Sequence, residues 1–102
     1  MAGDKREAEA KERSVEKKVV IKNRLGLHAR AAGKLRNLAA KYDSHIEIVN
    51  KTLTVNAKSV LGLMALEGYQ GTAILLRAQG KDAPEAVAAL ARLIEDRFGE
   101  EE

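Results

Sequence analysis

Two residues in one short segment, His28 and Arg30, are of the types that accept and bind phosphoryl groups. His28 follows Gly26 and stands directly before a helical pattern, where a helix presents unpaired N–H groups and the positive end of its dipole. That setting favours a neutral imidazole, whose free ring nitrogen is a nucleophile. The guanidinium of Arg30 can bind phosphoryl oxygens. The segment therefore predicts phosphoryl chemistry on His28.

A simpler interpretation is that His28 only caps the helix or lies exposed in a loop. For a single histidine near a glycine this interpretation is the commoner one, because short motifs often match by chance. The second histidine, His45, has no arginine or glycine beside it, and we expect it to be a surface residue.

Basic residues are concentrated in one part of the chain. Residues 17–42 hold eight lysines and arginines and no acidic residue, although the net charge of the whole chain is only +3. Arg24 and Lys34 stand on either side of His28 in this segment. The imbalance predicts a negatively charged partner, such as a phosphate, a nucleic acid or an acidic protein surface. Taken alone, a solvated basic helix face explains it more simply.

Composition excludes several classes of function. A chain of 102 residues is one domain. It has no cysteine and only two histidines, which argues against thiolate chemistry and a closed zinc site, so we expect no metal and no cofactor. No apolar run reaches membrane-spanning length and the first eighteen residues lack the apolar stretch of a signal peptide. A cytoplasmic, monomeric protein is therefore expected.

The pattern of the chain predicts one α+β domain. Residues 1–16 alternate charges with alanine and predict a flexible tail, which leaves 17–102 as the domain. Hydrophobic periodicity then predicts the order β-α-β-β-α-β-α, with a mixed or antiparallel sheet and helices on one face. The strands are expected over residues 19–21, 46–49, 52–55 and 73–78, and the helices over 29–42, 59–66 and 82–98.

Local signals support the helix positions. Asp82, Pro84 and Glu85 provide an acidic cap, a proline in the first turn and a capping-box partner for the last helix. Ser59 is expected to be the N-cap or a first-turn residue of the short helix. Gly33 lies inside the first helix, where it costs about 1 kcal/mol relative to alanine. We expect its purpose to be a close approach to a neighbouring strand.

The segment Gly26-Leu27-His28-Ala29-Arg30 resembles the phosphohistidine signature of the HPr family, the phosphocarriers of the bacterial phosphoenolpyruvate-dependent phosphotransferase system. A second segment, Asn56 to Met64, is similar to the regulatory serine signature of the same family. The resemblance covers about residues 17 to 98. It implies the HPr open-faced β-sandwich, with four antiparallel strands and three helices on one side.

The resemblance also implies a function. His28 would accept a phosphoryl group on Nδ1 from phosphorylated enzyme I and pass it to an enzyme IIA domain in sugar uptake. Arg30 would steady the phosphoryl charge during transfer. Because partner proteins load and unload the group, the protein would be a carrier and not an enzyme.

Ser59 would, by the same resemblance, be phosphorylated by an ATP-dependent HPr kinase/phosphorylase. A phosphate there adds nearly two negative charges and should weaken docking to an acidic partner. Without the resemblance, Ser59 is more simply only an N-cap. We expect Met64 to be exposed for partner contact, whereas Leu61 could be exposed or packed. The expected docking residues are Arg24, Leu27, Lys34, Val60, Leu61 and Met64.

Two other functions remain open. One is a regulatory relative in the nitrogen-related branch of the phosphotransferase system, which would use the same chemistry to control binding to targets. The other is a basic nucleic-acid-binding module, but three aromatic residues provide no stacking platform, so nucleic acid is not expected. One departure from the family is Ala31, where most members have proline, and it predicts a less rigid entry to the helix.

Overall fold

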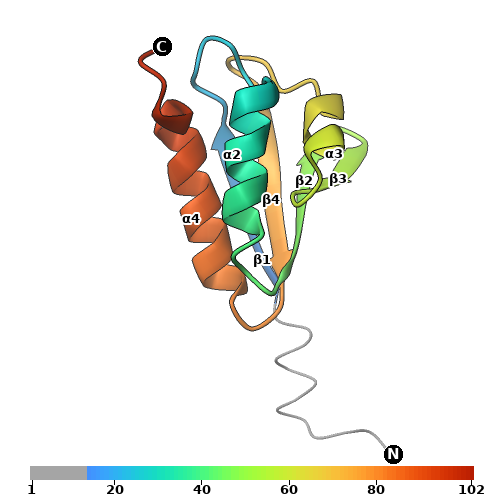
Figure 1. Ribbon diagram of the computed structural model, residues 1–102. Helices are drawn as coiled ribbons and strands as arrows, with labels where there is room; N and C mark the ends of the chain where they lie inside the picture. Colours follow the sequence, from blue (N-terminus) through green and yellow to red (C-terminus); the bar gives the residue numbers. More distant parts are fainter. Residues whose placement is uncertain (1–13) are drawn as a thin grey trace, which may run out of the picture.

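The sheet is open and fully antiparallel. The computed structural model describes residues 14–102, and within them four strands lie in the order β1-β4-β2-β3 (Figure 1). β1 (Ser14–Val20) and β2 (His45–Asn50) both pair with β4 (Ala73–Gln79), and β3 (Leu53–Asn56) pairs with β2. A tight turn at residues 51–52, with Lys51 at a φ of 57°, joins β2 to β3.

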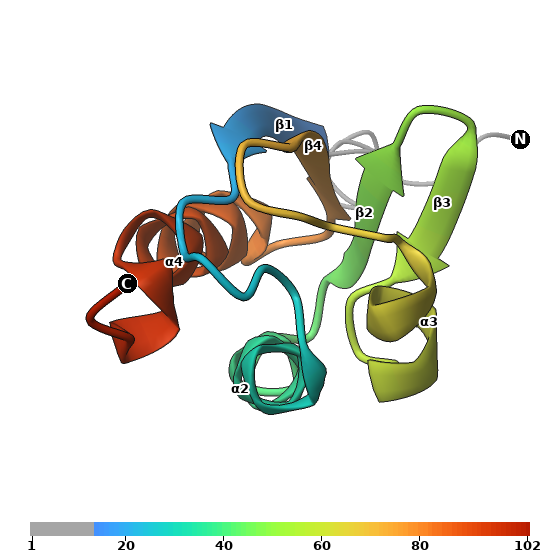
Figure 2. The ribbon, with the colours of Figure 1, turned by 90° about the horizontal axis from the view of Figure 1, so that it is seen from above.

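Within the described residues, three helices cover the same face of this sheet (Figure 2). They are α2 (Ala29–Ala39), α3 (Val60–Ala65) and α4 (Ala83–Glu95), and a 3-10 turn over Arg97–Gly99 follows α4. The element order and the one-sided helix layer confirm the predicted α+β open-faced sandwich. Within residues 14–102, no helix has both the length and the apolar character needed to cross a membrane.

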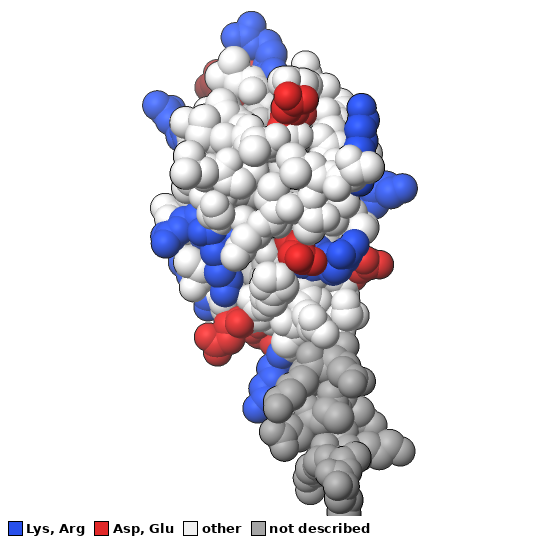
Figure 3. All heavy atoms as spheres, turned by 90° about the vertical axis from the view of Figure 1, so that its right-hand side faces the viewer, with Lys and Arg blue, Asp and Glu red and all other residues white. Residues whose placement is uncertain are grey.

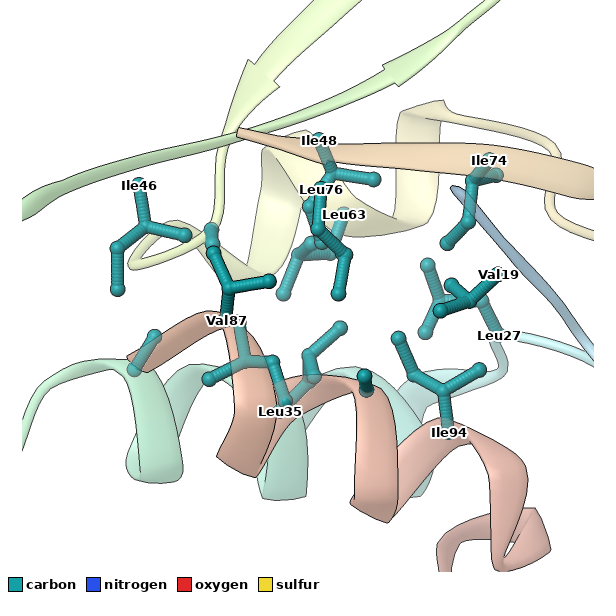
Figure 4. Close-up of a cluster of buried hydrophobic side chains, with 14 of the residues drawn as sticks. Val19, Leu27, Leu35, Ile46, Ile48, Leu63, Ile74, Leu76, Val87 and Ile94 are labelled. Atoms are coloured by element: carbon teal, nitrogen blue, oxygen red, sulfur yellow. The ribbon is translucent and has the colours of Figure 1, made fainter. Parts of the chain in front are cut away.

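The core between the sheet and the helices is almost entirely aliphatic (Figure 4). Alternate residues of β4, including Ile74 and Leu76, point toward the helices because side chains on a strand alternate between its faces. Leu35 of α2 and Leu90 of α4 meet them, and all four side chains are at least 98% buried. Among the aromatic residues only Phe98, after α4, is fully buried. Because α2 packs against the sheet in this core, the position of its first residues is fixed.

Several element boundaries differ from the prediction, including that of α4, which ends at Glu95 and not at Phe98. β1 begins at Ser14, so residues 14–16 belong to the sheet and not to a tail; residues 1–13 of the predicted tail lie outside the described part of the chain. Ladder pairing with all of β4, from Gln79 to Ala73, orders this charged edge strand, which has few apolar residues. α2 ends at Ala39 and not at Tyr42, which is only partly buried at the edge of the core.

The expected role of Gly33 is wrong. A Cβ at this position would have no heavy atom within 4 Å, apart from its own helix backbone, so no strand approaches it. Gly33 lies on the less packed side of α2 and is partly exposed. It therefore only weakens the helix.

Gly33→Ala is expected to stabilise the protein by about 1 kcal/mol, because alanine loses less backbone entropy in a helix and meets no neighbour here. The free energy of unfolding from urea titration measures the change. A loss of stability would show that α2 needs the glycine.

Asp82 occupies the predicted cap position of α4, but its side chain does not cap the helix. Its carboxylate instead accepts hydrogen bonds from the backbone N–H groups of Asp43 (2.8 Å) and Ser44 (2.9 Å) and from the Ser44 hydroxyl. The turn after α2 is thereby tied to the start of α4. The Ser44 hydroxyl and the Asp43 N–H hold the pKa of Asp82 below its usual value, although burial acts the other way.

Because the pKa of Asp82 is lower in the folded chain than in the unfolded chain, its contribution to stability is present above about pH 4 and is lost as the pH falls through the folded value. Asp82→Asn is therefore expected to lower the urea midpoint at neutral pH, and much less at about pH 3. Asp43→Asn, at an exposed neighbouring position, is the control for the change in charge. Equal losses in both variants at neutral pH would show that the Asp82 carboxylate does not stabilise the turn through these hydrogen bonds.

Candidate functional site

The loop before α2 is fixed by contacts at its glycine and leucine. Gly26 has a φ of +66°, a conformation that glycine adopts without steric cost. Its carbonyl accepts a hydrogen bond from the side-chain amide of buried Asn23 (2.7 Å). The next N–H, of Leu27, donates to the carbonyl of Gly68 (2.8 Å), and the Leu27 side chain packs in the core. These contacts set the point at which His28 enters the helix.

His28 is the N-cap residue of α2, as the sequence predicts. Its Nδ1 accepts a hydrogen bond from the backbone N–H of Arg30 (3.2 Å), and its carbonyl accepts one from the N–H of Ala32 (2.8 Å). The capping interpretation is therefore correct as geometry. The hydrogen bond from Arg30 also shows which ring nitrogen is unprotonated. An amide N–H can only donate, so Nδ1 must hold a lone pair.

Glu100 is the site residue that sequence reasoning missed. Its Oε2 contacts Nε2 of His28, and its Oε1 accepts a hydrogen bond from the Asn23 amide (3.0 Å). Figure 1 shows the C-terminal segment at the same end of the molecule as the loop before α2. Burial acts to raise the pKa of Glu100, but the hydrogen bonds from His28 and Asn23, with the nearby charge of Lys34, hold the pKa below its usual value.

The two neighbours of the imidazole assign its tautomer. An ionised carboxylate can only accept, so the ring proton lies on Nε2, facing Glu100, while Nδ1 carries the lone pair toward the Arg30 N–H. The His28 side chain is 27% exposed, so the site is open to a partner molecule. A ring nitrogen with a lone pair at a helix N-terminus can act as a nucleophile toward phosphorus.

The basic residues around His28 face the acidic end of the same chain. Arg24 pairs with the carboxylate of Glu102 (3.2 Å), and Nζ of Lys34 donates to the carbonyl of Phe98 (2.6 Å). Arg30 is exposed and lines an open depression with Arg24, Leu25, His28 and residues 100–102. The basic segment predicts a negatively charged partner, and the acidic residues at 100–102 of the same chain provide part of that negative charge.

Ser59 is the N-cap of α3, as predicted, and its hydroxyl accepts a hydrogen bond from the N–H of Gly62 (3.1 Å). Leu61 is 84% exposed and Met64 is 47% exposed, whereas Val60 is partly buried against the core. The exposure expected for Met64 is confirmed, and for Leu61 the packed alternative is excluded. α3 lies beside α2 in Figures 1 and 2, so this surface adjoins the His28 helix.

The side of the molecule that carries α3 and β3 has a broad area without charged residues in its half toward the His28 end (Figure 3). The large exposed apolar side chains of these elements and of the loop after α3 are Leu53, Leu61, Met64 and Tyr69. An apolar surface beside a basic one suits a partner with an acidic rim and an apolar centre.

The expectation that Leu27 contacts partner proteins is wrong. Leu27 is only 7% exposed, because its side chain packs under the loop into the core beside Gly68, where it cannot contact a partner. Leu25, two residues earlier, is 63% exposed and lines the depression instead. His45 lies on the surface as expected, with its Nε2 3.3 Å from the Glu47 carboxylate. Ala31 is fully buried in the first turn of α2.

Comparison with known proteins identifies related chains. A family model described as the PTS HPr component phosphorylation site matches residues 15–96. The phosphocarrier protein HPr of Xylella fastidiosa strain 9a5c is 42% identical over 87 residues, which is 85% of this chain and 98% of that protein. The phosphocarrier protein NPr of Shewanella violacea is 45% identical over 86 residues, 84% and 94% of the two chains. The crystal structure of HPr-C-His from Thermoanaerobacter tengcongensis matches with a TM-score of 0.83 and 44% identity, over 86% of this chain and 99% of that chain.

Proposed function

The chain belongs to the HPr family of phosphocarriers of the phosphotransferase system, and on that premise we propose that His28 is the residue that carries the phosphoryl group. The observation that carries this proposal is the state of the imidazole. Nδ1 holds a lone pair at the N-terminus of α2, with Arg30 beside it, and the opposite nitrogen holds the proton. This is the arrangement that a nucleophilic imidazole requires.

The transfer uses few groups of this chain. The Nδ1 lone pair forms a bond to phosphorus while the bond between phosphorus and the donor atom breaks, and its electron pair returns to the donor. The N–H of Arg30, which now donates to Nδ1, is in position to donate to a phosphoryl oxygen, and the Arg30 guanidinium neutralises charge on the group. The reverse sequence delivers the group to an acceptor. We take the donor to be enzyme I and the acceptor an enzyme IIA domain.

Partner docking is proposed to use the surface around His28 and α3. Arg24 and Lys34 supply positive charge, and Leu61 and Met64, flanked by Val60, supply apolar contact. Ser59 lies at the start of the same helix, so phosphorylation by an HPr kinase/phosphorylase would place negative charge at this surface. Ser59→Asp is a simple mimic and should slow acceptance from enzyme I, whereas Ser59→Ala should not.

Intact-mass measurement after incubation with phosphoenolpyruvate and enzyme I tests the proposal. We expect one added phosphoryl group on the wild type and on His45→Ala, and none on His28→Ala. The adduct should be lost in mild acid, because a phosphorus–nitrogen bond is acid-labile and a serine ester is not. An adduct on His28→Ala, or none on the wild type with an enzyme I that is active on another carrier, would contradict the assignment.

A second candidate is a regulatory phosphocarrier of the nitrogen-related branch, favoured by the similarity to the Shewanella NPr. It would use the same His28 chemistry but a different set of partners. Transfer rates from the enzyme I proteins of the two branches, measured in parallel with this chain, separate the candidates. The sugar-uptake function predicts faster acceptance from the sugar-branch enzyme I.

A further inference from the structure

The carboxylate of Glu100 is held at both of its oxygens. Oε1 accepts from the Asn23 amide and Oε2 contacts Nε2 of His28, while the side chain remains only 19% exposed. Asn23 is itself fully buried and also binds the Gly26 carbonyl of the active loop. Because both of its oxygens are held, this carboxylate is a fixed part of the site.

The backbone that leads to Glu100 is also held in place by the fold. Phe98 is 1% exposed and has a φ of 55°, and Gly99 has a φ of 79°, so the chain reverses after an anchored residue and returns toward His28. Lys34 holds the Phe98 carbonyl at 2.6 Å, and Arg24 pairs with Glu102 beyond the site. Contacts on both sides of Glu100 therefore fix its position.

We propose that Glu100 is a positioning residue for phosphoryl transfer: its carboxylate fixes the His28 ring and stabilises the positive charge that develops on it. The inference rests on the proposed function of His28. It assigns a role in the transfer to a residue outside both the Gly26–Arg30 and the Asn56–Met64 segments.

The chemistry follows from the two ring nitrogens. When the Nδ1 lone pair forms a bond to phosphorus, the ring still carries its Nε2 proton and so becomes cationic. The Glu100 carboxylate faces that proton from the opposite edge of the ring, where it does not obstruct Nδ1. A carboxylate paired with a histidine acts similarly in hydrolases, by holding the ring tautomer and stabilising the imidazolium. The interaction grows stronger as charge develops, and this lowers the barrier.

Other charges face the same depression. Arg24 and Arg30 line it with Glu101 and Glu102, and Lys34 lies close enough to Glu100 to affect its carboxyl. Only Glu100 among the three acidic residues contacts the imidazole within the described chain. The effect should therefore depend on this residue and not on the number of negative charges at the C-terminus.

Glu100→Gln tests the role, with Glu101→Gln as the control that removes the same charge one residue away. We expect Glu100→Gln to accept a phosphoryl group from enzyme I about tenfold more slowly, since a charge-assisted hydrogen bond becomes a neutral one. Glu101→Gln should remain within about twofold of the wild type. Circular dichroism and thermal unfolding confirm that both variants are folded.

Nuclear magnetic resonance gives a readout that does not depend on transfer. In the wild type, the Nε2–H proton of His28 should be observed, shifted downfield and protected from exchange by the carboxylate. In Glu100→Gln it should move upfield, and in Glu100→Ala it should exchange with solvent. The Nε2–H proton should be unchanged in Glu101→Gln.

The outcomes separate the two proposals. A wild type that accepts no phosphoryl group overturns the proposed function, and with it this role. A phosphorylated wild type with an equal or faster rate in Glu100→Gln overturns the role of Glu100 and leaves the function of His28 standing. An Nε2–H resonance that is identical in the wild type and Glu100→Ala overturns the role as well.

Discussion

Arg30→Ala is expected to slow phosphoryl acceptance by about 100-fold, the size of effect seen when a charge-stabilising donor is removed from a reacting centre. The Arg30 side chain is exposed at the rim of the depression, and its backbone N–H, which caps α2 through Nδ1, is retained in the alanine variant. The local fold should therefore survive while the guanidinium is lost. The initial rate of mass increase with phosphoenolpyruvate and limiting enzyme I measures the effect.

Arg36→Ala is the matched control for Arg30→Ala. Arg36 is an exposed arginine further along α2, and its guanidinium hydrogen-bonds to the side chain of Asn37 and not to the site. Arg36→Ala removes the same charge as Arg30→Ala, but away from the site. Its rate of phosphoryl acceptance should therefore stay within about twofold of the wild type. Arg30→Lys should fall between the two, because lysine keeps the charge but loses the planar donor pair. Equal rates in Arg30→Ala and Arg36→Ala would show that Arg30 contributes only through the general positive charge of this surface.

Gly26→Ala is expected to lower the free energy of unfolding by about 2–4 kcal/mol, a large share of the 5–15 kcal/mol typical of a domain. Two costs add at this position. The φ of +66° is unfavourable for alanine, and the new Cβ would overlap the Gly68 carbonyl oxygen that accepts the Leu27 N–H. Because this loop carries His28 into the helix, the rate of phosphoryl acceptance should fall too.

Gly71→Ala separates these two costs. Gly71 has a φ of +89°, but a Cβ there would have no heavy atom within 4 Å, so only the conformational cost of about 1–2 kcal/mol remains. Urea titration of both variants measures the difference. If the two substitutions cost the same, the close approach of the Gly26 loop to Gly68 does not constrain the site.

Local patterns were sufficient for much of the fold. The spacing of apolar residues predicts α2 and α4, and the placement of His28 and Ser59 before helical patterns predicts their N-cap positions. Residue type at a helix start depends mainly on the backbone next to it. The same reasoning fails for Asp82, which has the right type and position but whose side chain binds a turn 38 residues away.

Tertiary contacts account for the parts that sequence reasoning missed. Glu100 reaches His28 across 72 residues of sequence, and no local pattern predicts such a contact. The one available signal was the charge asymmetry: a basic segment around His28 and three glutamates at the end of the chain. Leu27 and Leu25 have the same residue type, and only the turn at Gly26 decides which of them is buried.

The most direct test of the central claim uses the two histidines of the chain as each other's control. Protein with ¹⁵N-labelled histidine is followed by nuclear magnetic resonance before and after incubation with phosphoenolpyruvate and enzyme I. We predict that the Nδ1 signal of His28 shifts and couples to phosphorus, while the signals of His45, paired with Glu47 on β2, do not change. Phosphorus on His45, or a phosphorylated protein in which neither histidine signal changes, would contradict it.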